Sequence, residues 1–175
     1  AVPLTEAWQV TPGADDAALS GAPGPWTLPP DGLADWRTLP GLEAARGPVV
    51  YQTTVSVPAD AAGPAAATSQ TARALRVRLG DVAGAAEVRW DDLPVGRALV
   101  PPFDVLVPAD AASPGEHTLT VTVRAPWRNR LLALGATGAP AYRQFAGRQD
   151  ATVPAGLLGP VTILQAAPEA DQAAQ

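Results

Sequence analysis

Hydrophobic and polar residues alternate strictly along three segments of the chain, at 51–57, 75–79 and 118–124. A period of two places apolar side chains on one face of a β-strand and polar side chains on the other. We therefore predict three antiparallel strands, each with one face in the core. The inward residues are predicted to be Tyr51, Thr53, Val55, Val57, Leu75, Val77, Leu79, Leu119, Val121 and Val123.

Shorter apolar segments between turns predict further strands. The chain contains 20 prolines and 16 glycines, which interrupt it too often for long helices. About eight short strands with turns between them are typical of a β-sandwich, so we predict an all-β fold, a jelly-roll β-sandwich. The additional strands are predicted at 26–28, 86–90, 95–99, 103–107 and 161–165.

The alternation fades between residues 133 and 155, and this segment is predicted to be a long loop. Long loops in compact domains are often functional or lie against a neighbouring domain. Tyr142, Arg143 and Phe145 in this segment belong to residue types that anchor interfaces. An ordered cover over one end of the sandwich is the alternative, and the sequence favours neither.

The chain divides into three parts. Residues 1–23 are predicted to be a lead-in segment with a short helix at 14–19, and residues 24–166 the sandwich, with an exposed Ala- and Pro-rich loop at 59–72. The tail, 167–175, has no β-branched or aromatic residue and is predicted to be disordered. The chain contains no methionine, which favours a domain cut from a longer protein.

The composition excludes several classes of partner and site. A net charge of −5 without a basic stripe argues against binding to nucleic acid. No apolar run approaches the ~18 residues that a membrane span needs. The absence of cysteine excludes disulfides and cysteine-based metal sites.

Few residues could carry chemistry. Asp91 and Asp92 are adjacent after a strand, whereas a glycosidase needs two carboxyl groups facing each other about 5–10 Å apart. We therefore predict an exposed hairpin turn, with the preceding Trp90 in the core. The single histidine, His117, cannot build a zinc site alone, and no serine lies in a nucleophile elbow. We expect no catalytic residue and no cofactor, with a structural calcium ion on Asp91, Asp92 or Asp104 as the minor alternative.

Carbohydrate binding is harder to dismiss. Sugar sites place an aromatic ring against the apolar side of the sugar and use Asp, Asn or Arg for its hydroxyl groups. The candidate residues of these types are Trp36, Arg97, Trp127, Asn129 and Arg130.

The segment "PWRNR" at 126–130 breaks the alternation and is expected to face one end of the sandwich. There Arg128 and Arg130 would be available for carboxylates on an adjacent domain. A structural role for this segment is favoured over ligand binding. The predicted interdomain contact residues are Arg128, Tyr142, Arg143 and Phe145.

The order of several motifs resembles that of a known family. "RVRLGDVAGAAEVRWDDLPVGR", "PPFDVLVP", "PWRNRLLALG" and "GLLGPV" follow one another, and the resemblance extends over about residues 24–164. The succession is similar to the galactose-binding-like sandwich of the β-galactosidase and β-glucuronidase superfamily, and most similar to the C-terminal sandwich domain of α-L-rhamnosidases of glycoside hydrolase family 106. That family usually has Asn-Gly where this chain has Asp91-Asp92, a departure that keeps the hairpin but leaves its turn type open.

The resemblance implies a non-catalytic accessory domain of a larger extracellular or periplasmic glycoside hydrolase. Its partner would be the catalytic domain of the same parent chain, which would carry the catalytic carboxylates. Segments 126–130 and 133–155 would form the contact. Two alternatives remain: an autonomous carbohydrate-binding module for a rhamnose-containing or other polysaccharide, and a protein–protein adhesion module.

Overall fold

A computed structural model describes residues 2, 4–13, 24–59 and 74–166. The helix predicted at 14–19, most of the loop predicted at 59–72 and the tail at 167–175 lie outside the described residues.

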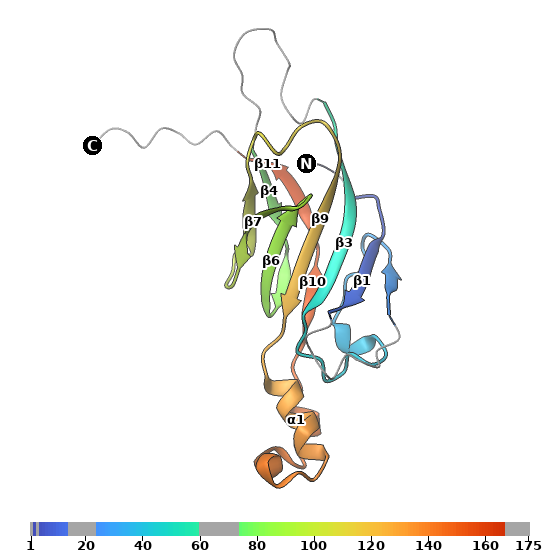
Figure 1. Cartoon of the computed structure of the whole chain (residues 1–175), viewed down its shortest axis with the longest axis vertical. Coiled ribbons are helices and arrows are strands. Elements are labelled where there is room, and N and C mark those ends of the chain that lie inside the picture. Colours follow the sequence, from blue (N-terminus) through green and yellow to red (C-terminus); the bar gives the residue numbers. More distant parts are fainter. Residues whose placement is uncertain (1, 3, 14–23, 60–73, 167–175) are drawn as a thin grey trace, which may run out of the picture.

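A six-stranded antiparallel sheet forms one layer of the fold (Figure 1). Its longest strands, β3 and β9, pair over nine positions at the centre, from Val49↔Val123 to Val57↔Gly115. The alternation of β-branched residues with threonines explains these strands, because it suits a sheet buried on one face only. In spatial order the strands are β2 (Trp26–Leu28), β1 (Trp8–Pro12), β3 (Val49–Val57), β9 (Gly115–Arg124), β6 (Ala85–Trp90) and β7 (Leu93–Ala98).

Two smaller antiparallel sheets form the opposing layer. One has three strands and the other has two, and all of their pairs are antiparallel. Their strands are β11 (Thr162–Gln165), β4 (Leu75–Arg78) and β8 (Asp104–Val107) in the first, and β10 (Gly156–Gly159) and β5 (Asp81–Ala83) in the second.

The core lies between the two layers, and the fold is the predicted all-β sandwich. Every side chain predicted to point inward from the three alternating segments is buried, including that of Thr53, which is 3% exposed. The five shorter strands are also present, with bounds shifted by two residues at most. Strands β5 and β10 were not predicted, because glycines bound both short segments and leave no alternation of apolar and polar residues.

Strand β1 begins inside the segment predicted to lead into the sandwich. It lies between β2 and β3 in the large sheet, and Trp8 and Val10 are fully buried in the core. The sheet therefore starts upstream of residue 24.

The turn between β6 and β7 is the predicted hairpin. Asp91 and Asp92 are exposed and Trp90 is fully buried. Asp91 has a φ of 51°, in the left-handed region that Asp tolerates better than most residues. Its carboxylate has a further role that the sequence did not reveal, since it accepts hydrogen bonds from the Thr118 amide (2.8 Å) and His117 Nδ1 (2.9 Å). The carboxylate thus joins the turn to β9.

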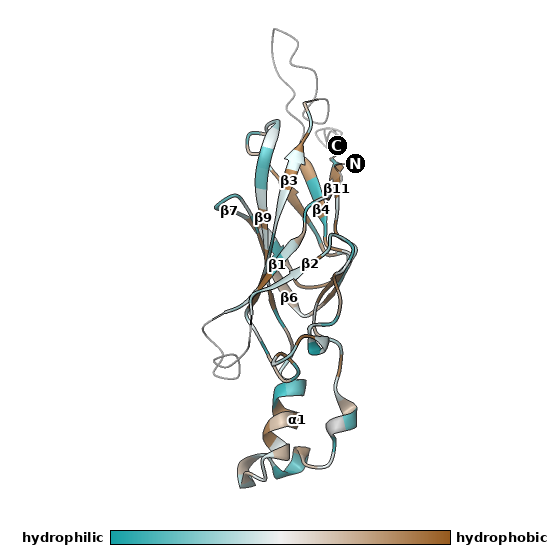
Figure 2. Cartoon of the chain, turned by 90° about the vertical axis from the view of Figure 1, so that its right-hand side faces the viewer, coloured by the Kyte–Doolittle hydropathy of each residue, from teal (hydrophilic) through white to brown (hydrophobic). Residues whose placement is uncertain are grey.

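A short helical arm projects from one end of the sandwich (Figures 1 and 2). We use "the arm" for residues 127–151, which contain α1 (Arg128–Ala136) and the 3-10 helices η3 (Pro140–Phe145) and η4 (Gln149–Ala151). At the opposite end, the Val2 amide donates to the Ile163 carbonyl of β11 at 2.7 Å. The loop predicted at 133–155 is therefore largely helical.

Candidate functional site

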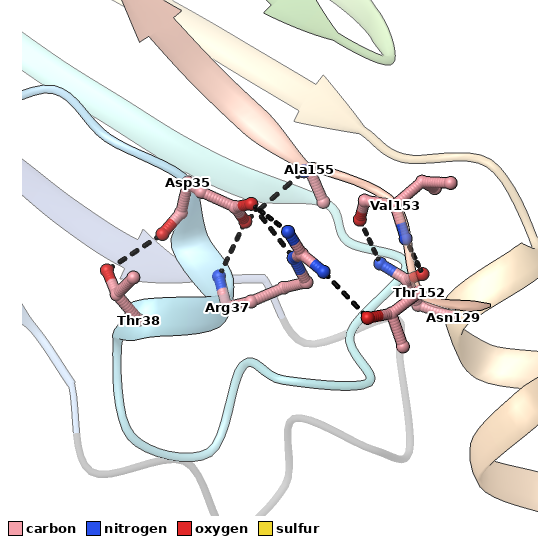
Figure 3. Close-up of polar contacts among 7 residues, drawn as sticks. All are labelled: Asp35, Arg37, Thr38, Asn129, Thr152, Val153 and Ala155. Carbon is pink, nitrogen blue, oxygen red and sulfur yellow. Dashed lines mark hydrogen bonds and ion pairs between the residues drawn. The ribbon is translucent and has the colours of Figure 1, made fainter. Parts of the chain in front are cut away.

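The base of the arm is held by a carboxylate on the 3-10 helix η2 (Trp36–Thr38). Asp35 caps this helix, and its Oδ1 accepts from the amides of Arg37 (3.0 Å) and Ala155 (3.3 Å). Its Oδ2 forms an ion pair with the Arg37 guanidinium, at 2.6 Å from Nη2 and 2.8 Å from Nε (Figure 3). One carboxylate therefore joins η2 to the segment that returns from the arm.

The segment that returns from the arm, residues 151–155, is also bound by the side chains of Arg37, Asn129 and Arg128. Arg37 Nη1 donates to Thr152 Oγ1 at 2.7 Å (Figure 3). The Asn129 amide forms two hydrogen bonds with the Val153 backbone, Nδ2 to the carbonyl at 2.8 Å and the amide to Oδ1 at 2.9 Å. Arg128 Nε donates to the Ala151 carbonyl at 2.6 Å. Both ends of the arm are thus fixed to each other and to the sandwich.

The Asp35–Arg37 pair is ionised in this setting. Partial burial alone would raise the pKa of Asp35, but the hydrogen bonds from Arg37 and Ala155 outweigh it, so that the pKa is lowered. The hydrogen bond to Asp35 raises the pKa of Arg37. Because both shifts favour the charged forms, the base of the arm keeps this ion pair at neutral pH.

Within the arm, α1 packs closely against η3. A Cβ on Gly135 would lie 2.7 Å from the Phe145 carbonyl carbon and 2.8 Å from its Cβ, so only glycine fits there. Leu132 is 4% exposed, while Tyr142 and Phe145 are half-buried. The arm therefore has its own small packed interior.

Trp127 stands exposed where the arm leaves the sandwich. It is 56% exposed, and the Arg46 guanidinium carbon lies 4.4 Å from the ring centroid. This distance is typical of a cation–π contact, which covers one face of the ring. Arg46 was not among the predicted site residues, since nothing in the sequence relates it to Trp127.

The five candidate carbohydrate-binding residues do not gather into one site. Trp36 is fully buried and Asn129 is 2% exposed with its amide bonded to backbone, so neither can meet a sugar. Residue type suggested them, whereas long-range packing decides their exposure. Trp127 and the half-buried Arg130 lie in the arm, while Arg97 lies on the sheet.

Arg97 lines a shallow groove of about 380 Å³ on the outer face of the large sheet. It forms an exposed ion pair with Glu87 at 3.2 Å. Both side chains are largely exposed, and the groove has no aromatic wall on which a sugar ring could stack. The lining residues are Glu87, Val88, Arg89, Pro94, Val95, Gly96, Arg97 and Thr122.

The predicted interdomain residues all lie in the arm. Arg128 and Arg143 are exposed, and Tyr142 and Phe145 are half-buried. The sequence missed the anchoring residues Asp35, Arg37 and Thr152. An aspartate two positions before an arginine in "DWRT" is compatible with a helix cap, which is the signal that could have found the first two.

Other chemistry has little support in the described part of the chain. No group of three or more His, Asp or Glu side chains there could hold a metal ion. Asp104, one of the residues considered for calcium, pairs instead with Arg76 and Arg78. No described helix is long and apolar enough to cross a membrane.

The fold is that of a β-sandwich domain related to parts of sugar hydrolases. The chain is similar to a rhamnosidase from Novosphingobium sp. PP1Y, with 30% identity and a TM-score of 0.66. That match covers 93% of this chain but only 15% of the rhamnosidase chain.

Two further solved structures share the fold at lower identity. A GH2 β-galacturonidase from Eisenbergiella tayi is 20% identical over 75% of this chain and 20% of its own, with a TM-score of 0.51. A β-glucuronidase from an uncultured Clostridium sp. is 18% identical over 71% of this chain and 22% of its own, with a TM-score of 0.53. No family model and no curated protein sequence matches the chain.

Proposed function

We propose that this chain is a non-catalytic accessory domain of an α-L-rhamnosidase-like glycoside hydrolase, located outside the cytoplasm as part of that larger enzyme. Its work is to pack against the rest of the enzyme through the arm and to stabilise it. The observation that carries the proposal is the similarity to the Novosphingobium rhamnosidase, which extends over 93% of this chain and 15% of that one.

The distribution of side chains supports a non-catalytic role. In the described residues, the carboxylates of Asp35, Glu87, Asp91 and Asp104 are each held by an arginine or by His117. The groove beside Arg97 is lined by one carboxylate, that of Glu87, whereas glycoside hydrolysis needs two. The catalytic carboxylates would then come from another part of the parent enzyme.

The arm supports the packing role. It is fixed at its base by Asp35, Arg37 and Asn129, so little conformational freedom is lost when a partner binds it. Trp127 is the large apolar side chain that it leaves most exposed. Aromatic and arginine side chains together are typical of the energetically important part of an interface.

The test uses the full gene product and the 175-residue chain side by side, with p-nitrophenyl α-L-rhamnopyranoside as the substrate. We expect the full product to hydrolyse it and the isolated chain to be inactive. Deletion of these residues from the full product should lower its thermal midpoint. Hydrolysis by the isolated chain, or a gene product without glycosidase activity, would refute the proposal.

A polysaccharide-binding module gives a different result in the same experiments. The isolated chain would be retarded in affinity gels containing rhamnose-bearing polysaccharide, and Trp127→Ala would abolish the retardation. The packing role instead predicts no retardation, because the interacting surface is built for protein.

A further inference from the structure

The arm carries a charge opposite to that of the chain as a whole. Residues 127–151 contain four arginines and one aspartate, a net charge of +3 within a chain of −5. Four arginines of the sandwich are paired with carboxylates: Arg37 with Asp35, Arg76 and Arg78 with Asp104, and Arg97 with Glu87.

The arginines of the arm differ from these. Within the described residues, no carboxylate lies at ion-pair distance from any of them. Arg128 donates only to a backbone carbonyl, through Nε. The four are Arg128, Arg130, Arg143 and Arg148.

The arm also carries apolar surface. Trp127 is 56% exposed at the root of the arm, and Tyr142 and Phe145 are half-buried beside Arg143. Arginine presents a planar fork of donors that fits carboxylates, and it is more weakly hydrated than lysine, so it tolerates burial in an interface. The arm therefore combines exposed apolar area with arginines that form no ion pair among the described residues, and both are typical of a protein interface.

We propose that the arm binds an acidic protein surface with an apolar centre, located on the remainder of the parent enzyme. This inference rests on the proposed function and specifies the chemistry of the surface that receives the arm. Charge complementarity favours it, because the arm has a net charge of +3 and no carboxylate among the described residues lies at ion-pair distance from its arginines. The partner surface would supply the carboxylates.

The aromatic residues favour a protein over an acidic polysaccharide. One face of the Trp127 ring is covered by Arg46, and Tyr142 and Phe145 are partly buried within the arm. Sugar stacking requires a flat aromatic face that is open to solvent, and each of these three rings is partly covered. A protein surface can instead pack against the edges and partly exposed faces that they present.

The test is hydrogen exchange of the α1 amides in the full gene product and in the isolated 175-residue chain. A docked arm should exchange about tenfold or more slowly in the full product. The variant Arg130→Gln/Arg143→Gln/Arg148→Gln should lose that protection, and high salt should weaken it. Arg128 is left intact because its Nε bonds the first turn of the arm to the carbonyl of Ala151 at the other end of the arm.

A matched control changes the net charge equally but away from the arm. Thr11→Glu/Gln52→Glu/Thr54→Glu adds three carboxylates at exposed positions on the outer face of β1 and β3. We expect protection of α1 within about twofold of the unmodified enzyme in this control. Measuring α1 exchange in each isolated variant shows whether the arm itself still folds.

The outcomes separate this inference from the proposed function. An active enzyme whose arm exchanges equally fast in the full product and the isolated chain would overturn the docking inference alone. Protection that the arginine variant retains would overturn the role of charge. Protection of the isolated chain by polygalacturonate, with none in the full product, would replace the protein partner with an acidic polysaccharide. A product without glycosidase activity would overturn both.

Discussion

Substitution of Asn129 by alanine should release the base of the arm. Asn129 is 2% exposed and its amide forms both available hydrogen bonds with the Val153 backbone. Alanine removes both bonds and leaves the amide and carbonyl of Val153 without their partners. Two neutral hydrogen bonds contribute about 1 kcal/mol each, and the partly buried groups left behind bring the total to about 2–3 kcal/mol.

Two measurements distinguish the forms that this loss can take. If the arm unfolds together with the sandwich, the thermal midpoint should fall by about 4–10 °C for a domain of this size. If the arm opens locally, the Val153 amide should exchange faster while the global midpoint stays unchanged. Limited trypsin digestion would then cleave first at the arginines of the arm.

The control is Gln144→Ala, an exposed position on η3, which should change stability by less than about 0.5 kcal/mol. Asn129→Asp is a second, sharper variant. It keeps an acceptor for the Val153 amide but turns a carboxylate oxygen toward the Val153 carbonyl, so it should not restore stability at neutral pH. If Asn129→Ala matched Gln144→Ala in midpoint, exchange and proteolysis, the anchoring role of the amide would be wrong.

Four further substitutions, one of them a control, test the sandwich by urea unfolding. The lowered pKa of Asp91 means that its charged form stabilises the fold above the unfolded-state value of about 3.9, so Asp91→Asn should be less stable at neutral pH, and the difference should shrink as the pH falls below about 4. A constant difference would contradict this. Gly156→Ala should destabilise by about 2 kcal/mol or more, because Gly156 has a φ of +112° and a Cβ would lie 2.7 Å from the Tyr51 hydroxyl oxygen. Gly115→Ala, at a φ of +136° with nothing within 4 Å, should cost less, and equal losses would show that packing is irrelevant. Trp90→Phe removes a 3.0 Å ring N–H bond to a loop carbonyl and should cost about 1–2 kcal/mol, which an unchanged midpoint would disprove.

The sandwich could be predicted from the sequence because the alternation of apolar and polar residues within one strand is a local pattern. In β3 and β9 the polarity of each residue indicates the face of the sheet on which it lies, so a period of two was enough to predict which side chains are buried. The hairpin at Asp91-Asp92 followed from the same pattern, since Trp90 shares the parity of the buried positions before it.

The arm could not be predicted from the sequence because its structure depends on contacts between residues that are distant along the chain. Leu131, Leu132 and Leu134 do not form one apolar stripe, so α1 lacks the pattern of an amphipathic helix, although arginine, leucine and alanine favour a helix by propensity. What orders the segment is the close approach of Gly135 to Phe145 and the bonds at its base. Of these contacts only the cap formed by Asp35 and Arg37 has a sequence signature, and that signature does not point to the arm.

The candidate sugar-binding residues were chosen by residue type, and their exposure also depends on contacts between distant residues. Trp36 was a reasonable sugar-binding residue by chemistry, but Gly156 allows the chain to pass directly over its ring, where a Cβ would lie 3.2 Å from Trp36 Cε3. The side-chain amide of Asn129 is likewise engaged in hydrogen bonds with the backbone of Val153. Exposure is set by the fold, so a list of suitable residue types overestimates the site.

The bridge between Val2 and Ile163 places the first and last described segments of the sandwich side by side, at the end away from the arm. A unit with this geometry can be spliced into a single surface turn of a host protein without stretching the host's backbone. We also expect it to tolerate circular permutation, since a few residues would suffice to join the two bridged segments. A connection made at this end would leave the arm free at the opposite end of the sandwich.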